Sequence, residues 1–429
     1  MDKDRIGSDT IKQFKTGFKN LWWNSSPDFP ALGARYDVSQ QTRMEVEMEN
    51  FIDKTVSEIK RFPAGTKGEC PEWGGRLREN VRGAGVNALG LSRDHMDLLL
   101  GKGFCDSTYE FIDNARRFDA SIKMDDILQA MRNVWTMNCI QLMLGRKVEY
   151  NPPLFAYSML YPYTDNYLDA PRISAEKKSR TADKLRLKLE GKPVGASDAY
   201  EERLFKLVEM IEGYYSREEY PEVFESLLWI HGAQQNSLLQ QKAAVSPYEC
   251  DILDLSFHKG GTSVLADAFL VNGRLTPEEA RFMFGLGVVL QLADDLQDAV
   301  ADKRNGHMTL FSQTAGRWPL DHIASKLFNF TLDVLDGGSC LKAPAMGEFS
   351  GLIAKSCMLL LFGAIAKNSS LFSRNYLKLI EGYSPLGFKY ARGMFGRVAR
   401  EYRNLRLKNA GRPVEIYMAR ALAMGAGAG

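Results

Sequence analysis

The chain has 429 residues, of which 45% are hydrophobic and 25% are charged, and its formal net charge is +2. This composition provides enough apolar material for a large core. The near-neutral balance gives no broad basic field, so we expect no nucleic-acid partner.

Cysteine usage and the N-terminus bear on the cellular compartment. The six cysteines are scattered and form no CxxC pair, which is typical of reduced, packed thiols. The opening Met1-Asp-Lys-Asp-Arg is followed by no apolar segment, so no signal peptide is predicted. The longest apolar runs are too short to cross a bilayer. We therefore expect a cytoplasmic protein, with peripheral membrane contact as an open alternative.

Apolar residues recur at helical spacing through most of the chain, and alternating strand patterns are scarce. The first 24 residues predict a basic amphipathic helix, residues 25–40 a loop, and residues 45–60 a helix. Glycine and proline in residues 62–80 interrupt the pattern. Further helices are predicted over residues 124–145, 152–169, 201–215, 220–243, 246–271, 277–300, 319–335 and 347–366. These elements predict an all-α fold.

The helical pattern contains no convincing linker between two cores. We expect a single large helical bundle over residues 111–420, with an N-terminal helical extension over residues 1–110 packed on it. Residues 421–429 end in Gly-Ala-Gly-Ala-Gly and predict a flexible tail. The sequence leaves the oligomeric state open, with a homodimer as one alternative.

The N-terminal segment has one apolar face, and lysines lie along its flanks. A basic amphipathic helix with aromatic residues suits an anionic membrane interface, so residues 1–24 are a candidate for membrane contact or for a cover over a cavity mouth. The alternative is an ordinary helix docked on the bundle, which Gly17 favours because it weakens an isolated helix. The apolar face consists of Ile11, Phe14, Phe18, Leu21 and Trp22.

The first of two aspartate-rich segments is Asp165-Asn-Tyr-Leu-Asp169. It lies at the end of a predicted helix that Pro171 terminates. Positions four apart share a face of a helix, so the two carboxylates point the same way. Taken alone, this pattern also describes an ordinary solvated helix end.

The second segment is Asp294-Asp295-Leu-Gln-Asp298, followed by Asp302, and it comes directly after a long apolar stretch. In a continuous helix Asp294, Asp298 and Asp302 would stack along one face. Carboxylates in apolar surroundings need partners, and like charges at this spacing repel. The pattern therefore predicts a bound divalent cation rather than a solvated surface.

Magnesium suits such a site, because it binds one or two carboxylates and keeps waters and substrate phosphates as its other ligands. Two aspartate-bearing helices that face each other in a bundle could hold several Mg²⁺ ions around one diphosphate, and Mn²⁺ is an expected substitute. The predicted metal ligands are Asp165, Asp169, Asp294, Asp298 and Asp302.

A third motif, His258-Lys259-Gly-Gly-Thr-Ser263, lies inside a predicted helix. The two glycines would loosen the helix and let the backbone approach a ligand. Lys259 could then neutralise a phosphate, and Thr262 or Ser263 could donate a hydrogen bond to it. The alternative is a helix kink packed by small residues.

Other polar residues give weaker signals. Lys303 and Arg117 are candidates for diphosphate contacts, although a solvated charge explains each as well. Asn236 and Gln240 lie one turn apart among apolar neighbours, where they predict either a polar strip of the cavity or a structural hydrogen-bond network. The predicted pocket residues are Tyr161, Asn236, Gln240 and Gln291.

At these residues the sequence resembles the class I terpenoid synthase superfamily. The segment from Leu290 to Asp298, with the residues up to Thr309, is similar to the second aspartate-rich region of trans-prenyl diphosphate synthases. The segment from Asp165 resembles the first such region, with Asn166 in place of its second aspartate. Lys259 and the following Gly-Gly-Thr resemble the lysine-bearing helix break of that superfamily. The resemblance extends over roughly residues 115–400.

The resemblance implies a bundle of the isoprenoid synthase type, a cluster of magnesium ions and an allylic diphosphate that is ionised to a carbocation. Magnesium would act as a Lewis acid on the leaving group, and Lys259 would contact the leaving diphosphate. An apolar, aromatic cavity would exclude water from the cation. The catalytic residues that the resemblance implies are Asp165, Asp169, Asp294, Asp295 and Asp298.

Two motifs of the superfamily are missing from this sequence, and their absence bears on the type of reaction that is expected. No Arg-Arg pair follows Asp169, where chain-elongating synthases bind a second diphosphate, and the Asn/Asp-Ser-Glu metal motif is absent. The sequence is most similar to bacterial large-terpene synthases, which implies a lyase that cyclises or eliminates a prenyl diphosphate. The alternatives are a chain-elongating prenyl diphosphate synthase and a non-catalytic isoprenoid-binding bundle.

Overall fold

A computed structural model describes residues 5–61, 71–101, 103–170, 172–241, 249–341, 346–408 and 419. All regular elements in these ranges are helices, which confirms the all-α prediction. In chain order they are α1 (Ser8–Asn24), α2 (Val38–Lys60), α3 (Pro71–Gly83), the π-helix η1 (Ala84–Ala88), α4 (Arg93–Leu100), α5 (Phe104–Phe118), α6 (Met124–Met143), α7 (Pro152–Asp169), α8 (Ala175–Leu189), α9 (Ala199–Glu212), α10 (Pro221–Ser237), the short 3₁₀ helix η2 (Leu238–Gln241), α11 (Ile252–Asn272), α12 (Pro277–Gln297), α13 (Ala299–Asn305), α14 (Leu310–Thr314), α15 (Asp321–Asp336), η3 (Gly337–Cys340), α16 (Met346–Lys367), η4 (Ser369–Leu371), α17 (Arg374–Glu381) and α18 (Phe388–Lys408).

The segment over residues 62–80 was predicted wrongly as a break in the helical pattern. The Gly- and Pro-rich break includes the helix α3, which begins at Pro71. Proline suits the first turn of a helix, where its missing N–H leaves no bond unmade. Trp73 and Leu77 are buried on one face of α3, and the indole of Trp73 donates to the carbonyl of Glu58 at 2.8 Å. Packing against α2 therefore outweighs the low helix propensity of the two glycines.

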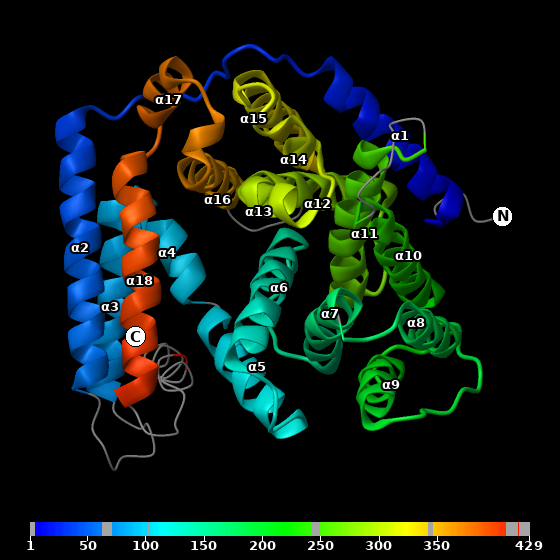
Figure 1. Cartoon of the computed structure of the whole chain (residues 1–429). Helices are drawn as coiled ribbons and strands as arrows, with labels where there is room; N and C mark the ends of the chain where they lie inside the picture. The colour runs from blue at the N-terminus through cyan, green and yellow to red at the C-terminus, as the bar shows by residue number, and fades with distance from the viewer. Residues whose placement is uncertain are drawn as a thin grey trace.

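The helices α11 and α12 form the centre of the bundle (Figure 1). The helices α6, α7 and α10 pack on α11, and α15 and α16 pack on α12. A Cβ atom added to Gly287 would lie 2.1 Å from the carbonyl oxygen of Gly260, so the two backbones touch here. Contrary to the predicted helix break, α11 continues without interruption through Gly260 and Gly261. These glycines allow close helix packing.

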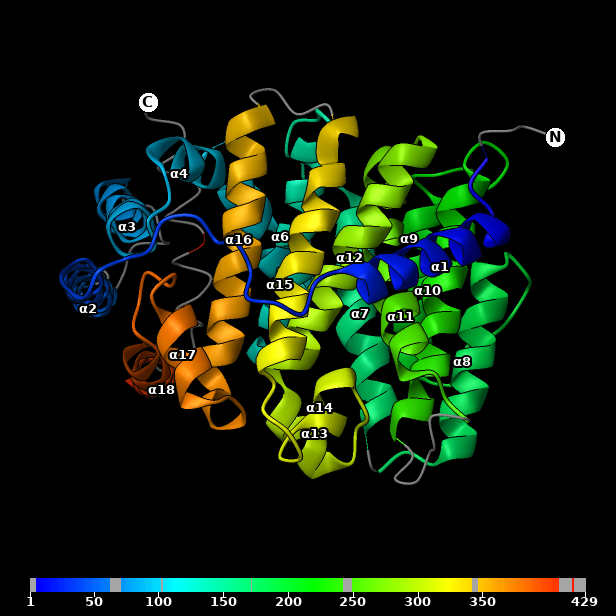
Figure 2. The ribbon, with the colours of Figure 1, turned by 90° about the horizontal axis from the view of Figure 1, so that it is seen from above.

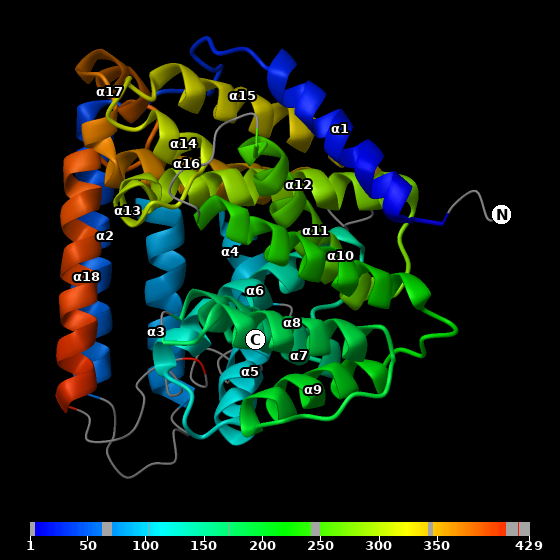
Figure 3. The same ribbon diagram turned by 45° about the vertical axis from the view of Figure 1, so that its right-hand side comes forward.

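The N-terminal helix α1 lies across the outside of the bundle, over α11, α12 and α15 (Figures 2 and 3). Its apolar face points inward, and the rings of Phe18 and Phe284 stack with centroids 5.9 Å apart. Lys15 pairs with Asp254 at 2.7 Å and Lys19 pairs with Asp251 at 2.6 Å. The aromatic face and two flanking lysines of α1 are therefore engaged by the bundle, as the docked alternative predicted.

A second, smaller core holds α2, α3 and η1 against the C-terminal helix α18 (Figure 1). Met48 and Ile52 of α2 pack there with Leu386. Arg397 of α18 pairs with Asp53 of α2 at 2.6 Å. The predicted extension over residues 1–110 is therefore divided between two places in the fold, and part of it is completed by the other end of the chain. The predicted tail lies outside the described residues.

Within the described ranges, only Gly347–Lys367 forms a helix long and apolar enough to cross a membrane by length and composition. Counting uninterrupted apolar runs missed it, because Lys355 divides the sequence. This segment belongs to α16, which packs against α12, α15 and α18. A core helix of a bundle meets the same criterion.

Candidate functional site

A cavity of about 170 Å³ opens among α6, α7, α10, α11 and α12. The charged side chains that line it include Lys259 from α11, Asp294 from α12 and Arg132 from α6. Most of its other side chains are polar, which departs from the apolar, aromatic cavity that the resemblance implied. Tyr161 of α7 and Gln291 of α12 line the cavity as predicted.

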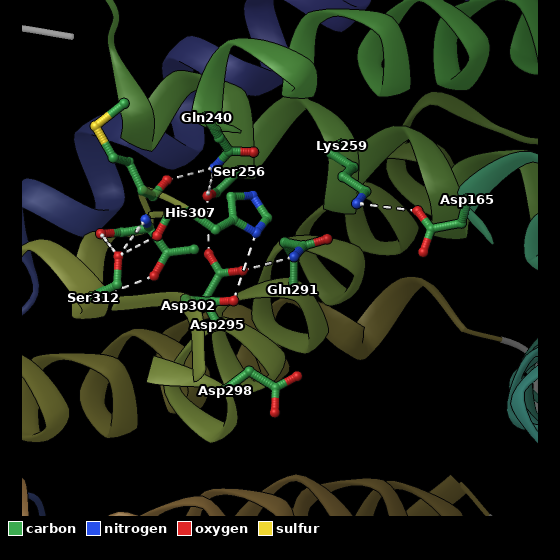
Figure 4. Close-up of polar contacts among 12 residues, drawn as sticks. Asp165, Gln240, Ser256, Lys259, Gln291, Asp295, Asp298, Asp302, His307 and Ser312 are labelled. Carbon is green, nitrogen blue, oxygen red and sulfur yellow. Dashed lines mark hydrogen bonds and ion pairs between the residues drawn. The ribbon is translucent and has the colours of Figure 1, made fainter. Parts of the chain in front are cut away.

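Lys259 lies between the two aspartate-bearing helices (Figure 4). Its Nζ atom is 3.8 Å from Oδ1 of Asp165. Both side chains are largely shielded from solvent, with exposed fractions of 20% for Lys259 and 26% for Asp165. Burial by itself would lower the pKa of Lys259. The negative charge of Asp165, acting together with Tyr161 and the aspartates of α12, outweighs burial and raises that pKa. Lys259 therefore remains a cation at neutral pH.

Asp294 is the carboxylate of α12 that faces the cavity. Burial raises its pKa, and the charges of Asp298 and Asp302 raise it further. No group in the described part of the chain donates a hydrogen bond to this carboxylate. An unpaired carboxylate in such surroundings is a poor structural element but a ready ligand for a cation.

Asp295 points to the other side of α12, outside the cavity lining, into a buried hydrogen-bond network (Figure 4). Its carboxyl group accepts from Gln291 Nε2 at 2.8 Å and from Ser256 Oγ at 2.9 Å. Gln240 Nε2 donates to Ser256 Oγ at 3.4 Å and to the carbonyl of Met308 at 3.1 Å. Gln240 therefore belongs to a structural network rather than to the pocket, which was one of the two alternatives.

The raised pKa of Asp295 leads us to a prediction about how the free energy of unfolding depends on pH. Burial raises this pKa to about 7, whereas an unfolded chain has an Asp pKa near about 3.9. The folded state thus binds the proton more tightly, so stability falls as pH rises from about 4 to about 7. Asp295→Asn imitates the protonated acid and removes this loss. We expect the variant to match the wild type near pH 4 and to exceed it by several kcal/mol at pH 8, since each pKa unit is worth about 1.4 kcal/mol.

The measurement is urea denaturation of both proteins, in chelator, across this pH range. A stability difference that does not change with pH would show that Asp295 stays ionised in the folded protein.

Asp298 and Asp302 do not stack with Asp294 as predicted. The helix α12 ends at Gln297, and Asp298 forms the junction with α13. Oδ1 of Asp298 accepts from Lys367 Nζ at 2.8 Å, and Asp302 lies 3.5 Å from Nδ1 of His307 (Figure 4). Within the described ranges, no three His, Cys, Asp or Glu side chains come close enough together to hold a metal ion.

The helix α12 ends at Gln297 because a side chain that follows α16 caps it there. The side-chain amide of Asn368 donates to the carbonyls of Leu296 at 2.8 Å and Gln297 at 2.9 Å. The last carbonyls of a helix have no partner within it, so a side chain that binds them stabilises the end of the helix there. Because Asn368 follows α16, far along the chain, nothing in the local sequence indicates this end.

Two predicted diphosphate ligands bind protein carbonyls instead. Thr262 is buried, and its Oγ1 donates to the carbonyl of His258 at 2.6 Å, one turn earlier in α11. Lys303 donates from Nζ to the carbonyl of Ala315. Neither side chain lines the cavity. A Thr hydroxyl inside a helix often binds the preceding turn in this way.

Three further predicted residues have different outcomes. Arg117 is exposed and pairs with Asp113 in its own helix at 2.6 Å, away from the cavity lining. Asn236 is exposed on α10, and the cavity is lined by Gln234 instead. The backbone of Asp169 ends α7 as predicted. The side chain of Asp169 lies outside the described residues.

Sequence reasoning missed several residues of the cavity, among them Arg132 and Asn133 of α6 and Asp267 of α11. Asn133 Nδ2 donates to Oδ1 of Asp267 at 3.0 Å. The available signal was the single aspartate in the apolar run from Val264 to Leu270, because a lone charge among buried residues needs a reason.

No family model matches the chain, and no curated protein matches it at a significant level. Its function is therefore inferred from the geometry and chemistry of the cavity.

Proposed function

We propose that this protein is a magnesium-dependent class I terpene synthase, built on a bundle of the isoprenoid synthase type, that ionises a prenyl diphosphate and releases diphosphate. The observation that carries the proposal is that carboxylates from two helices lie near Lys259. Asp165 of α7 is 3.8 Å from its Nζ atom, and Asp294 of α12 lines the same cavity as Lys259. Oxygen ligands for hard cations and a fixed positive charge are the groups that binding of a diphosphate requires. The polar lining fits the diphosphate end of the substrate.

The residues present fit magnesium. Asp165 and Asp294 would hold it together with water and diphosphate oxygens, because both carboxylates lie near Lys259 and no described residue donates a hydrogen bond to Asp294. Asp169 remains a proposed ligand beside Asp165, and Asp298 could join after releasing Lys367. When bound, magnesium stabilises the negative charge that develops on the leaving diphosphate.

The chain's own residues supply the remaining chemistry. Lys259 keeps its charge despite burial and donates to a diphosphate oxygen. When the bond between the allylic carbon and oxygen breaks, the electron pair stays on the diphosphate, and Lys259 stabilises it at that point. The hydroxyl of Tyr161, whose pKa burial raises to about 12, stays protonated and can donate in the same place.

A second candidate is a chain-elongating prenyl diphosphate synthase. Arg132 favours it, because this guanidinium lines the same cavity as Lys259 and could bind a second diphosphate. The sequence pattern gave no such arginine after Asp169, but the fold supplies one from α6.

The deciding experiment is incubation with prenyl diphosphates of ten to thirty-five carbons and Mg²⁺, with and without isopentenyl diphosphate, followed by mass spectrometry. We expect one substrate to be consumed alone and to give a hydrocarbon or an alcohol plus diphosphate. Products that remain phosphorylated and grow by five carbons only with isopentenyl diphosphate would establish the second candidate. If no prenyl diphosphate is consumed with Mg²⁺ or Mn²⁺, both candidates are wrong.

A further inference from the structure

The cavity has a second polar centre, which lies along α11 from Lys259. Asp267 lies on α11 two turns after Lys259, on the same face of the helix, and lines the same cavity. The two residues are separated along the helix axis by roughly 12 Å, since an α-helix rises about 1.5 Å per residue. A ligand whose diphosphate meets Lys259 could therefore reach Asp267 with its opposite end.

Asp267 is buried, and no described residue forms an ion pair with it. Only 1% of the residue is exposed, and its Oδ1 accepts from Asn133 Nδ2, which also donates to Ser158 Oγ at 3.2 Å. Its other oxygen, Oδ2, has no hydrogen-bond partner among the residues that the structure describes. Burial raises the pKa of Asp267 well above its usual value, so the group is a neutral acid with an unused O–H donor.

A second unused polar group lines the same cavity. Gln234 of α10 is 8% exposed, and its side-chain amide forms no hydrogen bond within the described residues. Buried polar groups in folded proteins are almost always hydrogen-bonded, and each one left unpaired is destabilising. A hydrocarbon chain packed against both groups would leave them without partners. A ligand with its own polar group would provide them.

We propose that Asp267 and Gln234 bind a hydroxyl group at the end of the ligand opposite its diphosphate. This inference rests on the proposed function, because Lys259 and its neighbouring aspartates hold the diphosphate. The O–H of Asp267 donates to the hydroxyl oxygen, and the amide oxygen of Gln234 accepts the hydroxyl proton. The substrate class is thus an oxygenated prenyl diphosphate rather than an unsubstituted one.

The test compares two ligands that differ by one oxygen atom. Geranyl thiolodiphosphate and its 8-hydroxy derivative have a C–S bond that resists ionisation, so calorimetry with Mg²⁺ measures binding without turnover. We expect the hydroxylated ligand to bind the wild type about tenfold more tightly, which is the effect of one good hydrogen bond to a buried group. Inorganic diphosphate serves as the probe for the charged end alone.

Two variants assign the preference to Asp267. In Asp267→Leu the preference for the hydroxylated ligand should disappear, while the affinity for inorganic diphosphate stays unchanged. In Asp267→Asn the preference should remain, because the amide keeps a neutral donor and an acceptor in the same place. Unchanged diphosphate binding by Asp267→Leu also shows that this variant is folded.

The possible failures are distinguishable. If the wild type binds neither thiolodiphosphate nor inorganic diphosphate, the proposed function is wrong. If the wild type binds both thiolodiphosphates equally, the diphosphate site stands and the hydroxyl site is wrong, with water as the occupant of that end of the cavity. A preference that survives in Asp267→Leu also overturns the assignment.

Discussion

Asp294→Asn is expected to lower kcat with a prenyl diphosphate and Mg²⁺ by roughly 100- to 1,000-fold, the size of effect seen when one charge-stabilising group is removed from an active site. Asp165→Asn should have an effect of the same order, because each change removes one proposed oxygen ligand near Lys259, one from α7 and one from α12. We expect the Asp294→Asn variant to remain as stable as the wild type. Burial and the charges of Asp298 and Asp302 disfavour ionised Asp294, so its neutral substitute should melt at the same temperature or higher.

The measurement combines steady-state kinetics with thermal melting in a Mg²⁺ titration, with and without diphosphate. The wild type should melt at a higher temperature when both are present, since a ligand that binds only the folded state stabilises it. Asn166→Ala is the matched control, because Asn166 is exposed and donates to Asp126 at 3.1 Å, outside the cavity lining. Full activity of Asp294→Asn, or of the wild type in excess chelator, would contradict the metal site.

Gly287→Ala is expected to destabilise the protein by about 3 kcal/mol or more, the upper end of the range for overpacked cores. The new Cβ would lie 2.1 Å from the carbonyl oxygen of Gly260, and this neighbour is backbone that cannot rotate away. The helices α11 and α12 would have to separate. Since Lys259 and Asp294 lie on these two helices, the cavity should lose its diphosphate affinity as well.

Urea denaturation measures this change, and Gly232→Ala is the matched control. Gly232 also lies inside a helix, but a Cβ there meets nothing within 4 Å. Alanine is a better helix former than glycine by up to about 1 kcal/mol, so the control should be slightly more stable than the wild type. If Gly287→Ala is as stable as the control, the close approach of the two backbones is not a constraint.

The helices and part of the site follow from local sequence. The helix α7 ends at Asp169, as the proline two positions later in the sequence predicts, and the apolar stretch before Asp294 places that carboxylate in buried surroundings. Both effects depend on neighbours in the chain, so spacing and composition predict them. The helix α3 was missed because its stability comes from the burial of Trp73 and Leu77 against other segments.

The direction of each side chain could not be predicted in the same way. Asn368 ends α12 from a distant part of the chain, and this end turns Asp298 toward Lys367. Asp267 and Arg132 enter the site only because α6 and α11 pack side by side. A pattern of residue types identifies candidates for a site, but the packing of distant helices decides which of them meet.

The pairing of α2 with α18 has a consequence for biosynthesis. Arg397 and Asp53, which join the two helices, are separated by 344 positions in the chain. At a ribosomal rate of about 5–20 residues per second, α2 waits on the order of tens of seconds before its partner is made. During that time Met48 and Ile52 lack part of the small core that buries them. A ribosome that stops before α18 therefore releases a chain with an uncovered apolar helix face, which marks the incomplete product for chaperones and proteases.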